Sequence, residues 1–386
     1  MALAPAGDLD KRLPAWGHHK ILIVTDPVIA RLGLLAGMTQ ALTEGGTAFV
    51  VFDEMTADAP LPLIEKGIHI FKTNACDALV AFGGGSVMDA AKTIGLSVAN
   101  DQSPRQLVGY FRGWSPPPPL YAVPTTAGTG SEVTVAAVIS DSDNNKKLFI
   151  VDTRLVPKMA ALDPCLMTGL SPHITATTGM DALTHAIEAF IGHWATPDSD
   201  RMALAAVALI YDNLRTAHTK GKDLAAREQM ALASTYAGLA FTRANVGYVH
   251  AIAHQFGAKY HTPHGLANAI MLPRVLRFYG ATVYDKLAVL AVQAKVGAQG
   301  EAIDVLAGKF LDAIEALNRD LGIPMQLDAL RKADIPALAK DACWEADTRY
   351  PVPQYMTLNQ CKALISQVLP KGKGRKIQHT SPSQML

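Results

Sequence analysis

The first part of the chain alternates short apolar segments with longer amphipathic ones, and this rhythm limits the fold more than any other feature. Apolar runs at 20–25, 47–52 and 77–82 are typical of strands that are buried on both faces. The segments 31–44 and 61–73 between them have the periodicity of helices. Strands that alternate with helices predict a parallel sheet covered by helices.

The alternation ends before the middle of the chain. Residues 136–140 and 148–151 predict an antiparallel hairpin across a polar turn. From about Leu170 onward, Ala- and Leu-rich segments with helical periodicity replace the strands. We therefore predict an α/β fold in which an N-terminal parallel-sheet domain, 1–169, is followed by an all-helical domain, 170–386.

The composition describes a soluble globular protein without a nucleic-acid or membrane partner. The 386 residues are 49% hydrophobic and 18% charged, and the net charge is +1. We expect the basic segment 371–376 to be a frayed terminus rather than a nucleic-acid contact. The scattered cysteines predict neither a disulfide framework nor a thiolate metal site. Residues 1–14 lack the apolar core of a signal peptide, so a cytoplasmic location is expected.

A glycine-rich turn follows the strand predicted at 77–82 and opens the next helix. Its glycines let a ligand approach the backbone closely, and the free N–H groups of the first helical turn form an anion site suited to a pyrophosphate. The predicted cofactor contacts in this turn are Gly84, Gly85, Ser86, Val87 and Met88. The turn lacks the G-x-G-x-x-G fingerprint of dinucleotide binding, so a plain tight turn is the alternative.

A second loop, 124–134, also follows a strand and is rich in hydroxyl groups and glycines. Ligands of open α/β sheets bind beyond the carboxyl ends of the strands, so two such loops in one sheet favour a dinucleotide. The predicted contacts from this loop are Thr125, Thr126, Thr129 and Thr134. An acid at a strand end would accept hydrogen bonds from the adenine ribose, and spacing alone does not choose between Asp26 and Asp53.

Two short phrases in the helical half indicate a metal site. Asp181 and His185 are four residues apart, as are His250 and His254, so each pair shares one face of a helix. His264 follows a Thr-Pro step, where the chain turns and can bring a further imidazole to the same point. Imidazole and carboxylate together are the ligands of a divalent transition metal such as Fe²⁺ or Zn²⁺.

Together these segments resemble the iron-containing (group III) alcohol dehydrogenases, the family that includes lactaldehyde reductase and certain butanol and ethanol dehydrogenases. The resemblance covers nearly the whole chain, from Lys20 to about Gln367. It rests on G-G-G-S-x-x-D-x-x-K at 83–92, P-T-T-A-G-T-G-S-E at 124–132, G-M-D-A-L-T-H-A-I-E at 179–188, and the histidine phrase at 250–265.

The resemblance implies roles for individual residues. The implied metal ligands are Asp181, His185, His250 and His264, with Fe²⁺ as the metal and Zn²⁺ as a possible substitute. Asp26 becomes the acid that favours NAD over NADP, and Lys147 contacts the nicotinamide side of the cofactor. His254 lies beside the metal without binding it. We expect it to relay the proton in catalysis, the alternative being that it orients a metal ligand.

The implied enzyme is an NAD-dependent alcohol dehydrogenase or aldehyde reductase, expected as a homodimer, that transfers a hydride reversibly between a primary alcohol and NAD. Its N-terminal domain binds NAD, and its helical domain binds the metal and the substrate. One alternative is a metal- and NAD-dependent lyase on the same scaffold, as in dehydroquinate synthase. A polyanionic lyase substrate would need more cations than Arg243, Lys259 and Arg274 supply. A non-catalytic sensor of nucleotide or metal is the other alternative.

The sequence departs from the family pattern at three places. The chain begins too late to supply the family's N-terminal β-strand, which is often exchanged between the subunits of a dimer. Asp58 stands where many members have an asparagine close to the cofactor. Ala136 replaces an asparagine of the substrate pocket in lactaldehyde reductase, which weakens the case for a diol substrate.

Overall fold

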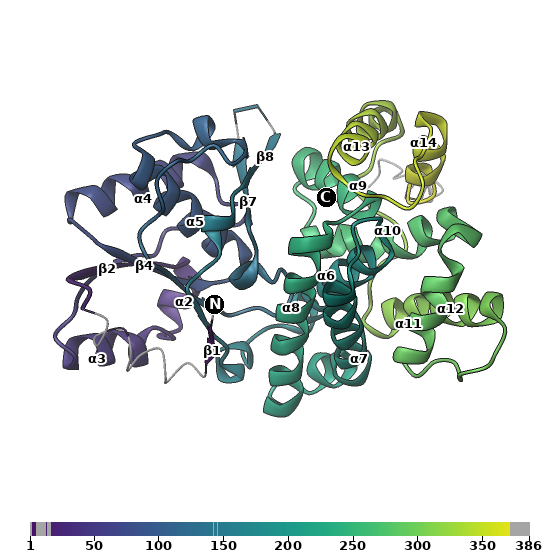
Figure 1. Cartoon of the computed structure of the whole chain (residues 1–386), viewed down its shortest axis with the longest axis horizontal. Coiled ribbons are helices and arrows are strands. Elements are labelled where there is room, and N and C mark those ends of the chain that lie inside the picture. Colours follow the sequence, from purple (N-terminus) through teal and green to yellow (C-terminus); the bar gives the residue numbers. More distant parts are fainter. Residues whose placement is uncertain (1, 5–12, 14–16, 142, 145, 371–386) are drawn as a thin grey trace, which may run out of the picture.

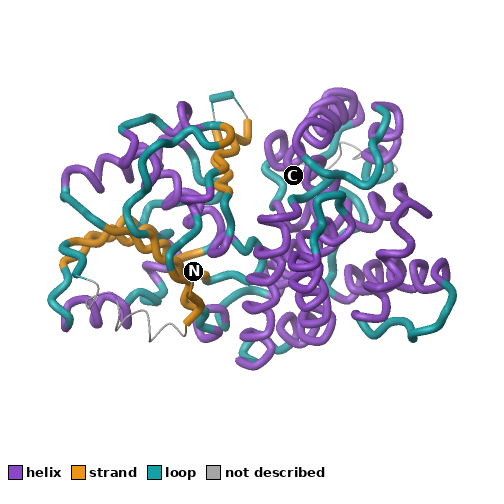
Figure 2. The backbone as a smooth tube through the Cα atoms, viewed as in Figure 1, coloured by secondary structure: helices purple, strands orange, loops and turns teal. Residues whose placement is uncertain are grey.

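The computed structural model describes residues 2–4, 13, 17–141, 143–144 and 146–370. Figures 1 and 2 show two lobes side by side, one that mixes strands with helices and one built of helices. The predicted basic terminus at 371–376 lies outside the described residues.

A six-stranded parallel sheet forms the centre of the N-terminal lobe, as predicted. Its order is β1-β9-β6-β4-β2-β3. The strands are β1 (Ala2–Ala4), β2 (Lys20–Val24), β3 (Ala48–Phe52), β4 (Ala78–Gly83), β6 (Leu120–Pro124) and β9 (Met159–Ala161). Because β2, β4 and β6 pair in parallel, their carboxyl ends lie along one edge of the sheet, where ligands of such folds bind.

Helices cover both faces of this sheet. They are α2 (Pro27–Arg31), α3 (Ala36–Glu44), α4 (Leu61–Thr73) and α5 (Gly85–Asn100). Successive residues of β2 point to opposite faces. Ile21 and Ile23 share a core cluster with Leu42 of α3, and Leu22 shares another with α4 and α5, which include Ile94.

Two sequence-based expectations about this lobe are wrong in detail. The helix expected at 31–44 begins only at Ala36, as α3, and Arg31 is the last residue of the preceding α2. Gly33 between them takes a left-handed φ of +70°, which interrupts the helix. An N-terminal strand, which the start of the chain was expected to exclude, is present: Ala2 of β1 pairs in parallel with Met159 of β9. A three-residue strand is too short to show a periodic pattern in the sequence.

The predicted hairpin is confirmed and belongs to a second sheet. Strands β7 (Ala136–Asp141) and β8 (Lys146–Val151) pair antiparallel, and β5 (Gly109–Tyr110) adds to the far side of β8. Figure 1 shows this hairpin turned toward the helical lobe.

The helices of the second lobe pack into one apolar core around α6, and α6 is buried along nearly its whole length. Its helices are α6 (Pro172–Ile191), α7 (Pro197–Thr219), α8 (Leu224–Ala244), α9 (Tyr248–Tyr260), α10 (His264–Tyr279), α11 (Tyr284–Gln293), α12 (Ile303–Asp320), α13 (Ile335–Arg349) and α14 (Leu358–Ser366). Short 3-10 helices are η1 (Pro104–Leu107), η2 (Ser131–Val133), η3 (Thr153–Leu155), η4 (Pro164–Met167), η5 (Gly280–Val283) and η6 (Lys332–Asp334). Within the described part of the chain, no helix has both the length and the apolar character needed to cross a membrane.

The two lobes meet where η2 packs on α8. The Thr235 hydroxyl of α8 donates to Glu132 Oε1 at 2.7 Å, and both groups are buried. At Gly130, where φ is +60°, a Cβ would lie 2.6 Å from Gly238 Cα. The backbones therefore touch, and neither glycine has room for a side chain.

Replacement of Gly238 by alanine should destabilise this junction. The new Cβ would lie 2.7 Å from Val133 Cγ2 and 2.8 Å from the Gly130 oxygen, and such overpacking costs about 1–3 kcal/mol. Gly308 of α12 is the matched control, because a Cβ there meets no atom within 4 Å. Gly308→Ala should stabilise by roughly 0.5–1 kcal/mol through helix propensity. Denaturant unfolding measures both, and equal effects of the two variants would contradict the packing argument.

Candidate metal centre

Three helices bring the candidate ligands together. Asp181 and His185 lie on α6, His250 lies on α9, and His264 is the first residue of α10. Helix α9 ends where His261 adopts a left-handed φ of +53°. The Thr-Pro step then turns the chain, as the sequence suggested, and α10 starts beside α6.

Gly265 makes the close approach of α10 to α6 possible. A Cβ at this position would lie 2.2 Å from the Thr177 oxygen of α6 and 3.2 Å from Asp181 Cβ. A side chain would push the start of α10 away and carry His264 with it. The glycine after the last histidine of the phrase is therefore a requirement of the site.

The four side chains form one cluster. One potential ligand atom from each of Asp181, His185, His250 and His264 lies within 4.8 Å of the others. The first three residues are buried, whereas the side chain of His264 keeps 38% of its surface exposed. The cluster is thus closed toward the helical core and open on the side of His264.

Burial keeps the inner imidazoles neutral. Desolvation lowers the pKa of His250 well below its ordinary value of 6.5, and the neighbouring histidines lower it further. Burial also lowers the pKa of His185, although the nearby carboxylate of Asp181 partly opposes the shift. A neutral ring has a nitrogen lone pair available to a metal ion at neutral pH.

Glu188, which the sequence analysis did not assign a role, orients His250. Its Oε2 lies 2.6 Å from His250 Nδ1, and its Oε1 accepts from the Val249 N–H at 2.8 Å. Burial raises the pKa of Glu188 to about 7. A carboxyl group on Nδ1 leaves Nε2 facing the cluster, which is how ligand histidines are commonly held. Glu188 is seven residues after Asp181, two helical turns along the same face of α6, and this spacing was a signal that could have found it.

Asn268 also lies inside the cluster and was missed from the sequence. Its Nδ2 donates to Asp181 Oδ1 at 2.7 Å and lies 3.2 Å from Nε2 of both His250 and His264. Its Oδ1 is buried and has no partner among the described residues. Three imidazoles, a carboxylate and a buried amide oxygen without a partner among the described residues fit a divalent transition metal.

His254 stands next to the cluster with its own carboxylate. Its Nδ1 lies 2.6 Å from Glu345 Oε1 of α13, which also accepts from the Tyr350 hydroxyl at 2.6 Å. The His254 ring stacks on the ring of His264, with centroids 5.2 Å apart, and meets the edge of Phe149. Glu345 was missed because it is 91 residues away in the sequence.

The predicted phosphate-binding turn begins α5 at the carboxyl end of β4. Gly84 is the N-cap of α5, and a Cβ on Gly85 would lie 2.7 Å from Thr129 Cγ2. The glycine turn and the threonine loop are therefore packed against each other, as two walls of one site. The side chains of Val87 and Met88 are buried in the core, so a ligand can reach only their backbone. The Met88 N–H already donates to the Gly84 carbonyl at 3.1 Å, so the predicted contact from Met88 is not supported.

A buried lysine supports the threonine loop. Lys92 Nζ of α5 donates to Ser131 Oγ and Thr134 Oγ1, both at 2.9 Å, and to the Ala136 carbonyl at 2.8 Å. Thr134 is thus held by Lys92, while Thr125 is buried and Thr126 is partly exposed beside Gly84. The loop has a fixed shape before any ligand arrives.

Asp26 follows β2, beside the glycine turn at the end of β4. Its Oδ1 caps α2 by accepting from the N–H groups of Val28 at 2.8 Å and Ile29 at 3.0 Å. Among the described residues, none forms a hydrogen bond with its second carboxylate oxygen.

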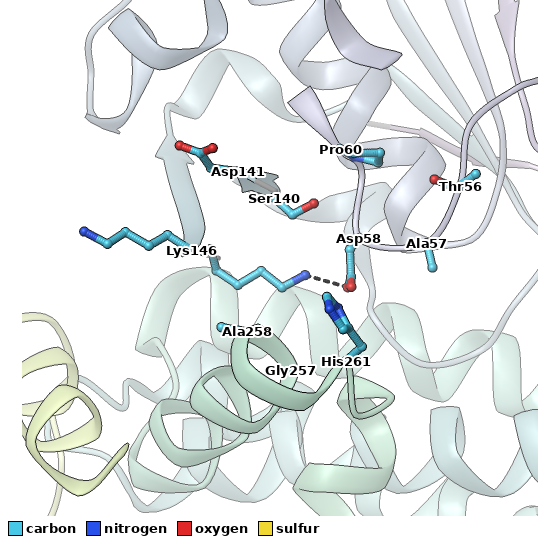
Figure 3. A pocket seen from close by; sticks show the side chains of 11 residues that line it. Thr56, Ala57, Asp58, Pro60, Ser140, Asp141, Lys146, Gly257, Ala258 and His261 are labelled. Carbon is cyan, nitrogen blue, oxygen red and sulfur yellow. Dashed lines mark ion pairs between the residues drawn. The ribbon is translucent and has the colours of Figure 1, made fainter. Parts of the chain in front are cut away.

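A cavity of about 220 Å³ lies between the two lobes (Figure 3). Lys147 of β8 lines it and forms an ion pair with Asp58 at 2.5 Å. Gly257, Ala258 and His261 of the α9 region form the opposite wall.

Comparison with known proteins places this geometry in a family. The model of the iron-containing alcohol dehydrogenases matches residues 5–164, and that of the C-terminal part of the Fe-containing alcohol dehydrogenase family matches residues 175–369. The chain belongs to the iron-containing alcohol dehydrogenases. The predicted family, fold class and enzyme class are confirmed, and the comparisons give no support to the lyase alternative.

Relatives cover most of the chain. Lactaldehyde reductase of Escherichia coli K12 is 37% identical over 87% of this chain and 88% of its own. The NAD-dependent methanol dehydrogenase of Bacillus methanolicus is 36% identical over 94% of this chain and 95% of its own. The crystal structure of a 1,3-propanediol oxidoreductase has a TM-score of 0.91 at 36% identity, over 95% of this chain and 97% of that one. The predicted cofactors, iron and NAD, agree with the family's metal and with the cofactor named for the Bacillus protein.

Alanine at His250 and alanine at His254 should have different effects on metal content. His250→Ala removes a buried ligand nitrogen and should lose the metal and turnover together. His254→Ala should retain the metal, because the His254 side chain is bound to Glu345 and lies beside the ligand cluster rather than within it. The reaction should nevertheless slow, because the proposed proton relay is lost. Metal content after dialysis and activity on the same samples measure both effects. Loss of metal from His254→Ala would show that the ligand set is assigned wrongly.

Proposed function

We propose that this protein is an NAD-dependent alcohol dehydrogenase and aldehyde reductase that transfers a hydride reversibly between a primary alcohol and NAD. The observation that carries the proposal is the buried cluster of Asp181, His185, His250 and His264, open only on the side of His264. This arrangement holds a metal firmly and leaves one direction of approach for a substrate oxygen.

We assign NAD binding to residues 1–169, and metal and substrate binding to residues 170–386. The packed glycine turn and threonine loop support a pyrophosphate site at the start of α5. Asp26 is proposed to accept hydrogen bonds from the adenine ribose, since one of its oxygens remains available after capping α2. A carboxylate there repels the 2′-phosphate of NADP.

A metal held by Asp181, His185, His250 and His264 would supply Lewis acidity toward the alcohol hydroxyl, and bound NAD would supply the hydride acceptor. The protein's own residues set the geometry. Neutral His185 and His250 provide lone pairs without competing protons. Phe241 stacks on the His185 ring at a centroid distance of 4.2 Å and shields this side of the site from water.

His254 is proposed to carry the proton released from the alcohol. Its Nδ1 is held by Glu345, so Nε2 is the nitrogen left to exchange a proton with a hydroxyl group or a water molecule. Glu345 is buried, and nearby His254 lowers the pKa of its carboxyl despite the opposing effect of burial. It is therefore a charged partner for a protonated His254.

We further propose a homodimer in the cytoplasm. Strand β1 ends the sheet order, so one of its edges is unpaired among the described strands, which supports pairing with a second copy. The four cysteines are all free thiols, which agrees with a reducing compartment.

The proposed reaction can be tested with metal-stripped protein. Fe²⁺ or Zn²⁺ is restored without oxygen, and NADH formation is followed by absorbance with primary alcohols of increasing chain length and with 1,2-propanediol. Metal-dependent turnover with NAD⁺, and much weaker turnover with NADP⁺, is the expected result. Lack of turnover with every alcohol and aldehyde while the metal is bound would refute the proposal.

Replacement of Glu345 by glutamine should lower kcat more than it changes KM. The amide keeps the size of the side chain but cannot act as a charged partner for a protonated His254. Proton transfer through His254 should weaken, and kcat should fall by about 10- to 100-fold. The pH dependence of kcat should shift in this variant, whereas its metal content should stay the same. An unchanged profile would indicate that Glu345 has only a packing role.

A further inference from the structure

The ion pair between Asp58 and Lys147 joins two parts of the cofactor cleft. Asp58 lies on the loop between β3 and α4, and Lys147 lies near the start of β8. Their charged atoms are 2.5 Å apart, and the two side chains are 43% and 13% exposed, respectively. Both residues line the cavity between the lobes, and a dashed line in Figure 3 marks their ion pair at the labelled Asp58.

The pair stands between the phosphate-binding turn and the metal centre. The Asp58 N–H donates to Ser86 Oγ at 3.0 Å, which ties the Asp58 loop to the first turn of α5. On the other side, Lys147 Cε lies 4.0 Å from the position of a Cβ on Gly257, which is one helical turn beyond His254 on α9. A dinucleotide that reaches from the turn to the metal centre must pass beside Asp58 and Lys147.

Asp58 changes the charge that such a ligand meets. Asp141, another acid of the cavity wall, is already paired with Arg105, whereas Lys146 is exposed. The Lys147 side chain is largely enclosed in the cavity wall, and the Asp58 carboxylate neutralises its charge. A ligand with a negatively charged diphosphate therefore gains little net attraction from the Asp58–Lys147 pair.

We propose that Asp58 sets the affinity for the cofactor: as the counterion of Lys147 it weakens binding of the dinucleotide and speeds release of NADH. This inference rests on the proposed NAD-dependent function. Release of product often limits turnover in dehydrogenases that close around their cofactor, so a weaker complex favours turnover.

The decisive variant is Asp58→Asn in the full-length, metal-loaded protein. Asparagine has the same shape and tolerates the left-handed φ of +69° at this position, so the loop is preserved. Titration with NADH, followed by its fluorescence, should show binding about 3- to 10-fold tighter than in the wild type, the size expected for one partly exposed charge. The affinity of the variant should also fall more steeply with salt, because Lys147 is now unpaired.

Asp101→Asn is the matched control. Asp101 also has a left-handed backbone, with φ +48°, and also pairs with a lysine, Lys72, at 2.6 Å. It lies at the C-terminal end of α5, away from the glycine turn. This variant removes the same net charge and should leave NADH binding unchanged.

Lys147→Met, alone and combined with Asp58→Asn, completes the test. Loss of Lys147 should cost more affinity in the Asp58→Asn background than in the wild type, because only there is its charge free to attract the diphosphate. Unchanged or weaker NADH binding by Asp58→Asn would overturn the inference, as would an equal gain in Asp101→Asn. If the wild type and all variants fail to bind NADH, the proposed NAD-dependent function is wrong instead.

Discussion

The helical lobe is organised by the need to hold polar ligand atoms in a space removed from water. A buried carboxylate such as Asp181 is costly unless other groups compensate it, and here Asn268 donates to it at 2.7 Å. Each of two histidines has a glutamate at its Nδ1: Glu188 for His250 and Glu345 for His254. The same kind of Glu–His contact therefore orients two rings: that of His250 toward the candidate metal and that of His254 toward the space beside it.

The anion site proposed in the α/β lobe has the opposite requirement: its backbone N–H groups must stay unpaired while its loops stay rigid. The ammonium group of Lys92 links α5 to the threonine loop and to β7, because its three N–H groups are shared among four oxygens within 3.0 Å. Burial lowers the pKa of Lys92 to about 8. The walls of the cleft are thus assembled before the cofactor arrives, which reduces the ordering cost of binding.

Much of this architecture could be predicted from the sequence because its signals are local. Residues 61–73 were expected to be helical and form α4 with those bounds, and the i, i+4 spacing of the candidate ligands identified two helix faces. The parts that were missed depend on distant partners or on very short elements. Glu345 reaches His254 across 91 residues, and β1 has only three residues. The break in the helix expected at 31–44 follows from the backbone conformation of Gly33, which periodicity does not report.

The contact between Gly130 and Gly238 also bears on how the cleft can open. Two backbones in contact, with no side chains between them, leave little freedom to slide past each other. If the lobes move relative to each other, this contact would act as the pivot, and the displacement would grow with distance from it. The β7–β8 hairpin extends away from η2 toward α9, so it carries Lys147 through the larger arc. The mouth of the cleft can thus widen to exchange a cofactor while the metal centre, built wholly within the helical lobe, keeps its shape.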